Sequence, residues 1–442
     1  MSQATPPLDS PPIKYRWHWI RTSIWVVPIG LCVAAIGLAV TALQVDRHCQ
    51  ACLLILPTLQ IELDAARGLL GVLITSVLSV GGVSFSVTMV ALTLTSGQYG
   101  PKVLRHFLED SRSKLSLGLF FATAVYALVI SVALHDGDHP RFSVIIALLL
   151  ALAALIEFIA FIHRTASDLQ ADQLIQRLGT QLRQDMRRLC EVAEQANRLH
   201  GSAQWRRRAR DRIPIVIRSG YEGYVQTTDI PAIAEQLATL EAMAILRVRP
   251  GDFVVRGAEL FTLFKARNFD IDEGKLGIEE AIRLGPVRTP IQDPNFPITQ
   301  IQQIAARALS TGINDPGTAI TCIDWLTLAL AEIVDAALPG STVLDKEGKC
   351  RLLVTTLDFA AVADAVYSPL RQFSGSNLQV YQRLFDSLNR LAMCTDRPER
   401  LLTLRTQGER LWEQMERQDY PEHDRAPVRR RFKKLVRLTQ AS

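Results

Sequence analysis

Four long apolar segments near the N-terminus constrain the fold of this chain more than any other feature. They lie at residues 23–43, 69–94, 115–134 and 142–162, and none of them contains a lysine or an arginine. A helix of about 20 apolar residues crosses the hydrocarbon core of a bilayer. The sequence therefore predicts a membrane protein in contact with the lipid bilayer, with a four-helix transmembrane domain over residues 1–164.

The lysines and arginines outside these segments predict the orientation of the helices. Basic residues gather before the first segment, between the second and third, and after the fourth: Lys14, Arg16, Arg21, Lys102, Arg105, Arg112, Lys114 and Arg164. Because basic residues of short loops stay on the cytoplasmic side, both termini are expected in the cytoplasm. Cys49 and Cys52 then lie in an outward loop, where they either form a disulfide or have no special role.

The second apolar segment is rich in glycine, serine and threonine. Small and hydroxyl residues recur on one face at helical spacing, at Ser79, Gly82, Ser86 and Thr93. Small residues let membrane helices pack closely, and hydroxyl groups also solvate ions weakly enough to release them. This face is expected either to pack against another helix or to line a pathway across the membrane.

Glu157 lies inside the fourth apolar segment. A carboxylate in hydrocarbon is costly, so such a residue has either a function or a partner that neutralises it. The first interpretation places Glu157 on the same pathway as the hydroxyl face. The second gives it a hydrogen bond from a serine or threonine of the second segment, or places it near enough to water to stay charged.

The chain after the fourth span is expected to be an α+β cytoplasmic region. Residues 165–212 are predicted to form a long connecting helix, because apolar residues recur in a heptad-like seam over residues 171–199, with a break at Asp185. The seam would either pack on the chain's own domain or join subunits.

A small β-rich domain is expected over residues 213–265, followed by a mainly helical domain over residues 266–442. The turn Arg249-Pro250-Gly251-Asp252 resembles the second half of a biotinyl/lipoyl-like β-sandwich. No lysine occupies the tip where such domains carry a cofactor. The likeness therefore implies a sandwich-like fold and not a swinging cofactor arm.

Polar motifs of the helical domain supply the candidate binding residues Arg288, Asp293, Asn314 and Asp315. Asp315 precedes Pro316, and this pair is typical of a helix N-cap followed by a proline in the first helical position. An exposed helix N-terminus with an arginine nearby would bind an anion. The alternative interpretation is a well-capped junction between two helices.

The sequence lacks the motifs of common enzymes and metal sites. It contains no Gly-x-Ser-x-Gly, P-loop or His-Glu-x-x-His pattern, and no cluster of histidines and cysteines at metal-ligand spacing. We therefore expect no catalytic residue, no metal and no cofactor. The net charge of +5 fits cytoplasmic anchoring of a membrane protein better than nucleic-acid binding.

Two stretches in and after the second span form a recognisable signature. They are Gly82-Val83-Ser84-Phe85-Ser86-Val87-Thr88 and Thr95-Ser96-Gly97-Gln98-Tyr99-Gly100-Pro101. Together with the turn at Arg249 and the segment 308–316, they resemble a bacterial family of membrane proteins known as domain of unknown function 2254. The resemblance covers nearly the whole chain. It implies an inner-membrane location and assigns no catalytic residue.

Two functions fit these expectations. An oligomeric channel or transport-type protein would line its pathway with the hydroxyl face and Glu157, and the region after the fourth span would regulate it. Several copies of the chain would then form a homo-oligomer, and a small ion or an anionic molecule would be its ligand. The alternative is a membrane-anchored sensory or scaffolding protein whose cytoplasmic region binds a ligand.

Overall fold

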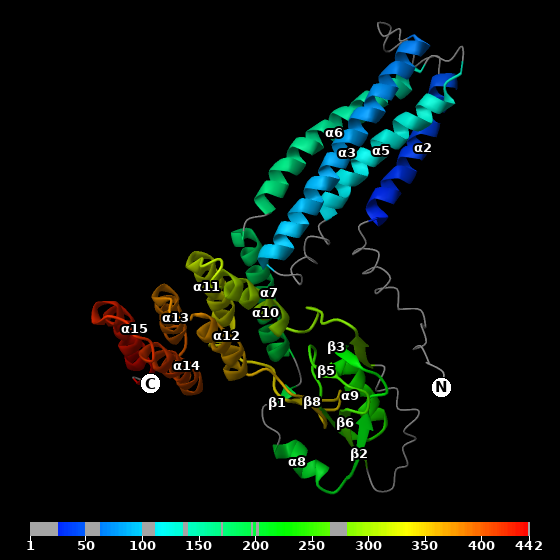
Figure 1. Cartoon of the computed structure of the whole chain (residues 1–442). Helices are drawn as coiled ribbons and strands as arrows, with labels where there is room; N and C mark the ends of the chain where they lie inside the picture. The colour runs from blue at the N-terminus through cyan, green and yellow to red at the C-terminus, as the bar shows by residue number, and fades with distance from the viewer. Residues whose placement is uncertain are drawn as a thin grey trace, which may run out of the picture. The chain divides into compact units, whose positions relative to one another are not determined.

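The chain divides into two units (Figure 1), residues 1–170 and residues 171–442, here called the membrane unit and the C-terminal unit. The structure, a computed structural model, describes residues 25–48, 62–99, 111–135, 140–168, 171–195, 198–199, 203–265 and 281–440.

The membrane unit contains the four apolar helices that the sequence predicts. Within the described residues they are α2 (Val26–His48), α3 (Leu63–Tyr99), α5 (Ser111–Ala133) and α6 (Arg141–Asp168). Each includes a stretch that is long and apolar enough to cross a membrane, and the four helices lie side by side in Figure 1. The predicted architecture of this unit is confirmed.

Helix α5 is the best-covered helix of the membrane unit. Its side chains Phe120, Tyr126 and Ile130 are buried, and it packs against α2, α3 and α6. The other three helices expose many valine, leucine and isoleucine side chains. Exposed apolar side chains are expected on helices that face lipid. A helix also satisfies its own backbone polar groups, as the hydrocarbon core of a bilayer requires.

Polar contacts tie the ends of the membrane helices together. The carboxylate of Asp46 on α2 accepts hydrogen bonds from the backbone N–H groups of Phe142 and Ser143 at 2.9 and 3.0 Å. These N–H groups begin α6 and have no partner within that helix. Arg67 on α3 donates to the carbonyl oxygen of Leu134 at 2.9 Å. One charged side chain thus caps the start of α6, and another satisfies a carbonyl just after α5.

The described residues of the C-terminal unit form a sheet of six strands and a sheet of three. The six-stranded sheet has the order β1-β8-β9-β4-β6-β2, and the smaller sheet has the order β5-β3-β7. All neighbours are antiparallel except β4 and β9. The strands are β1 (Arg198–Leu199), β2 (Ile213–Arg218), β3 (Gly223–Thr228), β4 (Met243–Leu246), β5 (Phe253–Val254), β6 (Glu259–Lys265), β7 (Ile282–Gly285), β8 (Thr342–Leu344) and β9 (Cys350–Leu353).

Helices complete the C-terminal unit. Those in and around the sheets are α8 (Ala203–Ala209) and α9 (Ile230–Thr239). Those of the helical part are α10 (Asn295–Ala308), α11 (Pro316–Ile333), α12 (Phe359–Phe373), α13 (Leu378–Ala392), α14 (Pro398–Glu416) and α15 (Glu422–Gln440). The helices of this part pack through apolar side chains and through buried hydroxyl groups. The hydroxyl oxygen of Ser387 lies 2.6 Å from that of Thr327 and 2.5 Å from that of Tyr367.

The heptad-like seam packs inside the C-terminal unit. Helix α7 (Ala171–Gln195) buries Ile175, Leu178 and Leu182, and it contacts α10 and α11. At Gly179, α7 and α11 approach so closely that a Cβ atom would lie 2.5 Å from the ring of Trp325 on α11. Of the two expectations for the seam, packing on the chain's own domain is the one that the structure shows for α7.

The predicted long helix over residues 165–212 is wrong in its extent. Helix α6 ends at Asp168, α7 runs from Ala171 to Gln195, and the strand β1 and the short helix α8 follow. The reason is tertiary: Arg198 and Leu199 pair with Val343 and Thr342 of β8, so a distant strand overrides the local helical pattern.

The predicted sandwich over residues 213–265 is also incomplete. Strands β8 and β9, from the part expected to be helical, extend the same sheet through the parallel pairing of Ala244 with Leu352. Strand β7 pairs with β3, also from outside the expected boundary. A β-hairpin around Asp345 can be read from its turn residues, but its long-range partner cannot. The structure places these strands in one unit with the helices.

Candidate functional site

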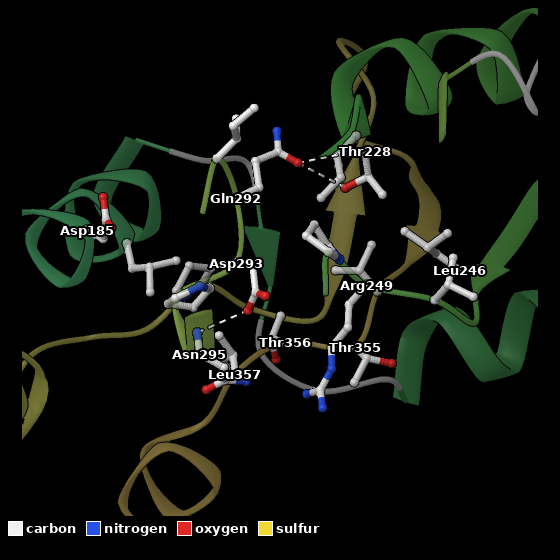
Figure 2. A pocket seen from close by; sticks show the side chains of 18 of the residues that line it. Asp185, Thr228, Leu246, Arg249, Gln292, Asp293, Asn295, Thr355, Thr356 and Leu357 are labelled. Carbon is white, nitrogen blue, oxygen red and sulfur yellow. Dashed lines mark hydrogen bonds between the residues drawn. The ribbon is translucent and has the colours of Figure 1, made fainter. Parts of the chain in front are cut away.

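A cavity of about 370 Å³ lies within the C-terminal unit. Helix α7 forms one wall, and the end of β3 with the start of α9 and the end of β4 form another. The loops that precede α10 and follow β9 complete the lining. Figure 2 shows Asp185 of α7 on one side and Thr228, Leu246 and Arg249 on the opposite side. The volume is within the range of small-molecule sites, about 300–1,000 Å³.

Most of the cavity wall is apolar or proline. Leu246, Val248 and Val354 contribute from the buried core of the sheets, and Leu189 contributes from α7. Proline residues stiffen the loops of the lining, because the ring fixes the backbone φ angle. They are Pro231, Pro250, Pro290, Pro294 and Pro339. The backbone of the lining is therefore restricted at five positions that lie in several different segments.

The loop before α10 is held in place by its own side chains. Gln292 accepts a hydrogen bond on Oε1 from the backbone N–H of Thr228 at 2.8 Å (Figure 2). This bond joins the loop to the end of β3. It also satisfies a backbone donor that the strand ladder leaves open.

Arg288 and Asp293, both predicted as binding residues, form an ion pair with each other. Nε and Nη2 of Arg288 donate to the two carboxylate oxygens of Asp293, whose side chain is only 1% exposed. Asp293 also accepts from the backbone N–H of Asn295 at 3.1 Å. Asp293 lines the cavity. Its carboxylate, however, is committed to partners within the chain and positions the start of α10.

The turn between β4 and β5 requires a glycine at position 251. Its φ angle is +95°, and a Cβ atom there would lie 2.4 Å from Oδ2 of Asp293. The turn therefore packs directly on the Arg288–Asp293 pair.

Two buried acceptors of the lining have no hydrogen-bond partner among the described residues. They are Oδ2 of Asp185 on α7 and Oδ1 of Asn295 at the start of α10. Burial raises the pKa of Asp185, and the nearby Arg188 offsets part of this effect. Buried acceptors without a donor are unfavourable unless water or a ligand supplies one. Asp185 and Asn295 are therefore the lining residues that hold a buried acceptor without a donor among the described residues, and a ligand that reaches these atoms would supply one.

Two arginines of the lining lie toward solvent and already have acidic neighbours. Arg188 approaches Oδ1 of Asp185 at 3.6 Å, and Arg249 approaches Asp252 at 3.4 Å. Both arginine side chains are exposed. They border the cavity and do not add an unmatched charge to its interior.

Asn314 and Asp315 are not among the residues that line the cavity. Asp315 caps α11 by accepting hydrogen bonds from Thr318, at 2.6 Å from the hydroxyl and at 3.1 Å from the backbone N–H. These bonds hold the pKa of Asp315 below its usual value. Asn314 has a positive φ angle of 48°, as a tight junction between α10 and α11 requires. The contacts of Asn314 and Asp315 are therefore those of a capped junction between α10 and α11.

The predicted pathway face of α3 is exposed along the described part of the helix, at Ser79, Gly82, Ser86 and Thr93. The hydroxyl groups of Ser79 and Thr93 donate back to the carbonyl oxygens of Thr75 and Met89, at 2.8 and 2.9 Å. A Cβ atom at Gly82 would meet no atom of the described chain within 4 Å. Among the described residues, no other helix therefore covers Gly82.

Glu157 has partners within the membrane unit. It forms an ion pair with Arg164, about two helical turns further along α6, and it accepts a hydrogen bond from the hydroxyl of Ser116 on α5 at 2.6 Å. The neutralising partner is therefore on α5 and α6, and not on the second span as expected. Helices α5 and α6 are joined by this contact.

The described residues contain no group of three or more histidine, cysteine, aspartate or glutamate side chains that could hold a metal ion. Cys49 and Cys52 lie outside the described residues, as does the basic stretch 102–110.

Comparison with known proteins adds the family. The profile of predicted membrane proteins called DUF2254 matches residues 21–390, which include all four apolar helices and the cavity. The chain belongs to the DUF2254 family. The match ends within α13, so it covers the four apolar helices and the part of the C-terminal unit that lines the cavity.

Relatives of this DUF2254 protein occur in mycobacteria. Proteins of Mycobacterium bovis and Mycobacterium tuberculosis, each named as an uncharacterized protein, are 27% identical over 375 residues, covering 82% of this chain and 70% of theirs. No solved structure matches the chain significantly.

The sequence missed most of the cavity lining of this DUF2254 protein. Arg288 and Asp293 were found because they lie in a polar motif, but Asn295 and the α7 wall were not. One signal was present: the apolar seam breaks at Asp185, which is one of the residues that line the cavity. An acid that interrupts a buried helix face is a sign of a polar site next to that face.

Proposed function

We propose that the protein is a membrane-anchored ligand-binding protein of sensory type, in which the cavity of the C-terminal unit binds a small organic molecule. The supporting observation is an apolar cavity of about 370 Å³ with two buried acceptors that lack partners among the described residues. A largely apolar cavity with a few polar groups is the usual form of a small-molecule site.

Helix α7 is the proposed link from the cavity to the membrane. It contributes Asp185, Arg188 and Leu189 to the lining and begins three positions after the last residue of α6, the fourth apolar helix. A ligand that binds more tightly when α7 is in one of two positions would shift the protein toward that position. The segment connected to α7 would then change with it. On this proposal the C-terminal unit is cytoplasmic and the protein resides in the inner membrane, because the basic residues flanking the spans favour that orientation.

Substituting Ile291→Trp tests the cavity. Ile291 lines it and is 53% exposed, so a larger ring there would obstruct the cavity without entering the apolar core. Ile313→Trp is the matched control, since Ile313 is 50% exposed and is not part of the lining. With full-length protein in nanodiscs and a fragment set, we expect ligand-observed NMR to detect fragments whose affinity falls about tenfold or more only in Ile291→Trp.

The proposal fails if no fragment binds, or if every bound fragment has the same affinity for Ile291→Trp and Ile313→Trp. Such results would mean that the cavity is an internal packing gap and that any binding occurs elsewhere.

The second candidate function is an oligomeric channel or transporter, favoured by the exposed small-residue face of α3. Ser79, Gly82, Ser86 and Thr93 offer a surface on which a second copy of α3 could approach closely. A homo-oligomer built this way would enclose a pathway that one copy cannot. Glu157 supports this candidate less, because its carboxylate is already engaged by Arg164 and Ser116.

Substituting Ser86→Leu tests this second candidate. If the face lines a pathway, the larger apolar side chain is expected to reduce ion flux in reconstituted liposomes by about tenfold or more, since it blocks and dries the lining. Val83→Leu, at an exposed position beside this face, is the control. Equal flux in both variants, or no flux from folded wild-type protein, would rule out a pathway along α3.

A further inference from the structure

We infer that the ligand of the cavity is an organic cation: a primary amine in its ammonium form with an apolar body. This inference rests on the proposed function and deepens it. It starts from the buried side-chain atoms of the lining that have no hydrogen-bond partner among the described residues, and both of these are acceptors.

The open groups are acceptors. Oδ2 of Asp185 and Oδ1 of Asn295 are both buried without a donor among the described residues, and they come from different elements, α7 and the start of α10. An acceptor in such a position is satisfied by a ligand N–H or O–H group. Among donors, a cationic N–H forms the strongest hydrogen bond with a carboxylate.

The charges of the lining favour a cation over an anion. Asp293 is neutralised by Arg288, and Arg249 has Asp252 beside it. Arg188 reaches Asp185 only at 3.6 Å, and from an exposed position on the same helix. The second oxygen of Asp185 therefore carries the one charge of the described lining that is both buried and open on one side.

The apolar walls define the rest of the ligand. Leu246, Val248 and Val354 line the cavity, and Leu357 follows from the loop after β9. Burying an apolar body against these side chains supplies affinity, while the ammonium group supplies orientation. A molecule with a short chain between an ammonium group and an aromatic or aliphatic body has this chemistry.

The test compares three probes of similar shape: 2-phenylethylammonium, neutral 2-phenylethanol and anionic 3-phenylpropanoate. Affinities are measured with the full-length protein in nanodiscs. We expect the ammonium probe to bind about tenfold or more tightly than the other two, as one charge-assisted hydrogen bond allows. Asp185→Asn is expected to remove this preference and to leave the affinity for the alcohol unchanged.

Two further variants keep the test informative. Asn295→Asp adds a second carboxylate at the first residue of α10, where an acid also suits the helix N-terminus, and is expected to raise the affinity for the ammonium probe. Asp396→Asn changes an exposed aspartate that is not part of the lining and is expected to change nothing.

The outcomes separate this inference from the proposed function. Equal binding of alcohol and ammonium, or preferred binding of the carboxylate, overturns the cation while the cavity remains a ligand site. Ammonium binding that survives both Asp185→Asn and Ile291→Trp overturns the assignment to this cavity. Absence of binding by all three probes overturns the cation, and the fragment comparison of Ile291→Trp with Ile313→Trp then decides the proposed function separately.

Discussion

Gly179→Ala is expected to destabilise the packing of α7 on α11 by about 2 kcal/mol, although alanine is the better helix former. In an exposed helix the same change would stabilise by about 1 kcal/mol. Here the added Cβ would lie 2.5 Å from Cε3 and 2.8 Å from Cβ of Trp325. The ring cannot move away without shifting α11, and overpacking of this kind costs about 1–3 kcal/mol.

The thiol of Cys322 offers a direct readout of this packing. Cys322 lies on α11, is fully buried, and burial raises the pKa of its thiol well above the usual value, so it reacts only when the helices separate. A loss of about 2 kcal/mol corresponds to about thirty times more frequent opening. We expect Cys322 in the Gly179→Ala protein to react with a maleimide faster by about that factor, measured by mass spectrometry of the full-length protein.

Trp325→Phe supplies the control for Gly179→Ala. The smaller ring leaves room for a Cβ, so the double variant should lose less stability than the sum of the two single variants. Simple addition of the two effects, or an unchanged Cys322 reaction rate in Gly179→Ala, would contradict the close helix contact.

Asp345→Asn is expected to destabilise the β8–β9 hairpin by about 3 kcal/mol at pH 7, because it leaves the buried charge of Arg351 without the opposite charge of a carboxylate. The side chains of Asp345 and Arg351 are 5% and 9% exposed, and Nε of Arg351 donates to Oδ2 of Asp345 at 2.7 Å. The same carboxylate accepts from the backbone N–H groups of Glu347 and Lys349 at 2.9 and 2.8 Å.

The effect of Asp345→Asn should depend on pH. Burial favours the protonated acid, but the hydrogen bonds from Arg351, Lys349 and Glu347 outweigh it and hold the pKa of Asp345 below its usual value. A carboxylate with a lowered pKa stabilises the folded state above about pH 4 and loses this contribution as the pH falls through its folded-state pKa. The difference between wild type and Asp345→Asn should therefore be full at pH 7 and shrink below about pH 4.

The buried thiol of Cys350 on β9 reports the opening of this hairpin, again through its rate of modification at pH 7. Glu347→Gln is the matched control, because Glu347 lies in the same hairpin but its side chain is 70% exposed and pairs only with Lys349. We expect it to change stability little. Equal rates for Asp345→Asn, Glu347→Gln and wild type would show that the buried pair does not hold the hairpin. The pH series uses urea unfolding, since thiol reactivity itself varies with pH.

The sequence predicts the membrane helices well and the C-terminal unit only in part. Four apolar segments leave few alternatives, because backbone in lipid must be helical or part of a barrel. The strands β1, β8 and β9 are short, and the pairings of β1 with β8 and of β4 with β9 join residues more than 100 positions apart, as Ala244 and Leu352 illustrate. Local periodicity contains no information about such partners, so residues 198–199 were assigned to a helix.

The candidate site, too, could be predicted from the sequence only in part. Arg288 and Asp293 stand out in the sequence because they are polar and near turn residues, yet the structure uses them to hold each other. Asp185 and Asn295 became candidates only when the fold brought α7, the sheets and α10 around one cavity. Which polar group is satisfied within the chain and which is left open depends on tertiary contacts, and a sequence pattern cannot separate the two.

Hydrogen exchange of the full-length protein in nanodiscs, with and without 2-phenylethylammonium or the tightest-binding fragment, tests the central claim most directly. A ligand slows exchange where it stabilises the structure around its site. We predict slower exchange in the loops 290–295 and 354–357 and in α7, with no such change in Ile291→Trp. Protection that is absent from these three segments, or that persists unchanged in Ile291→Trp, would contradict a ligand-binding cavity in the C-terminal unit.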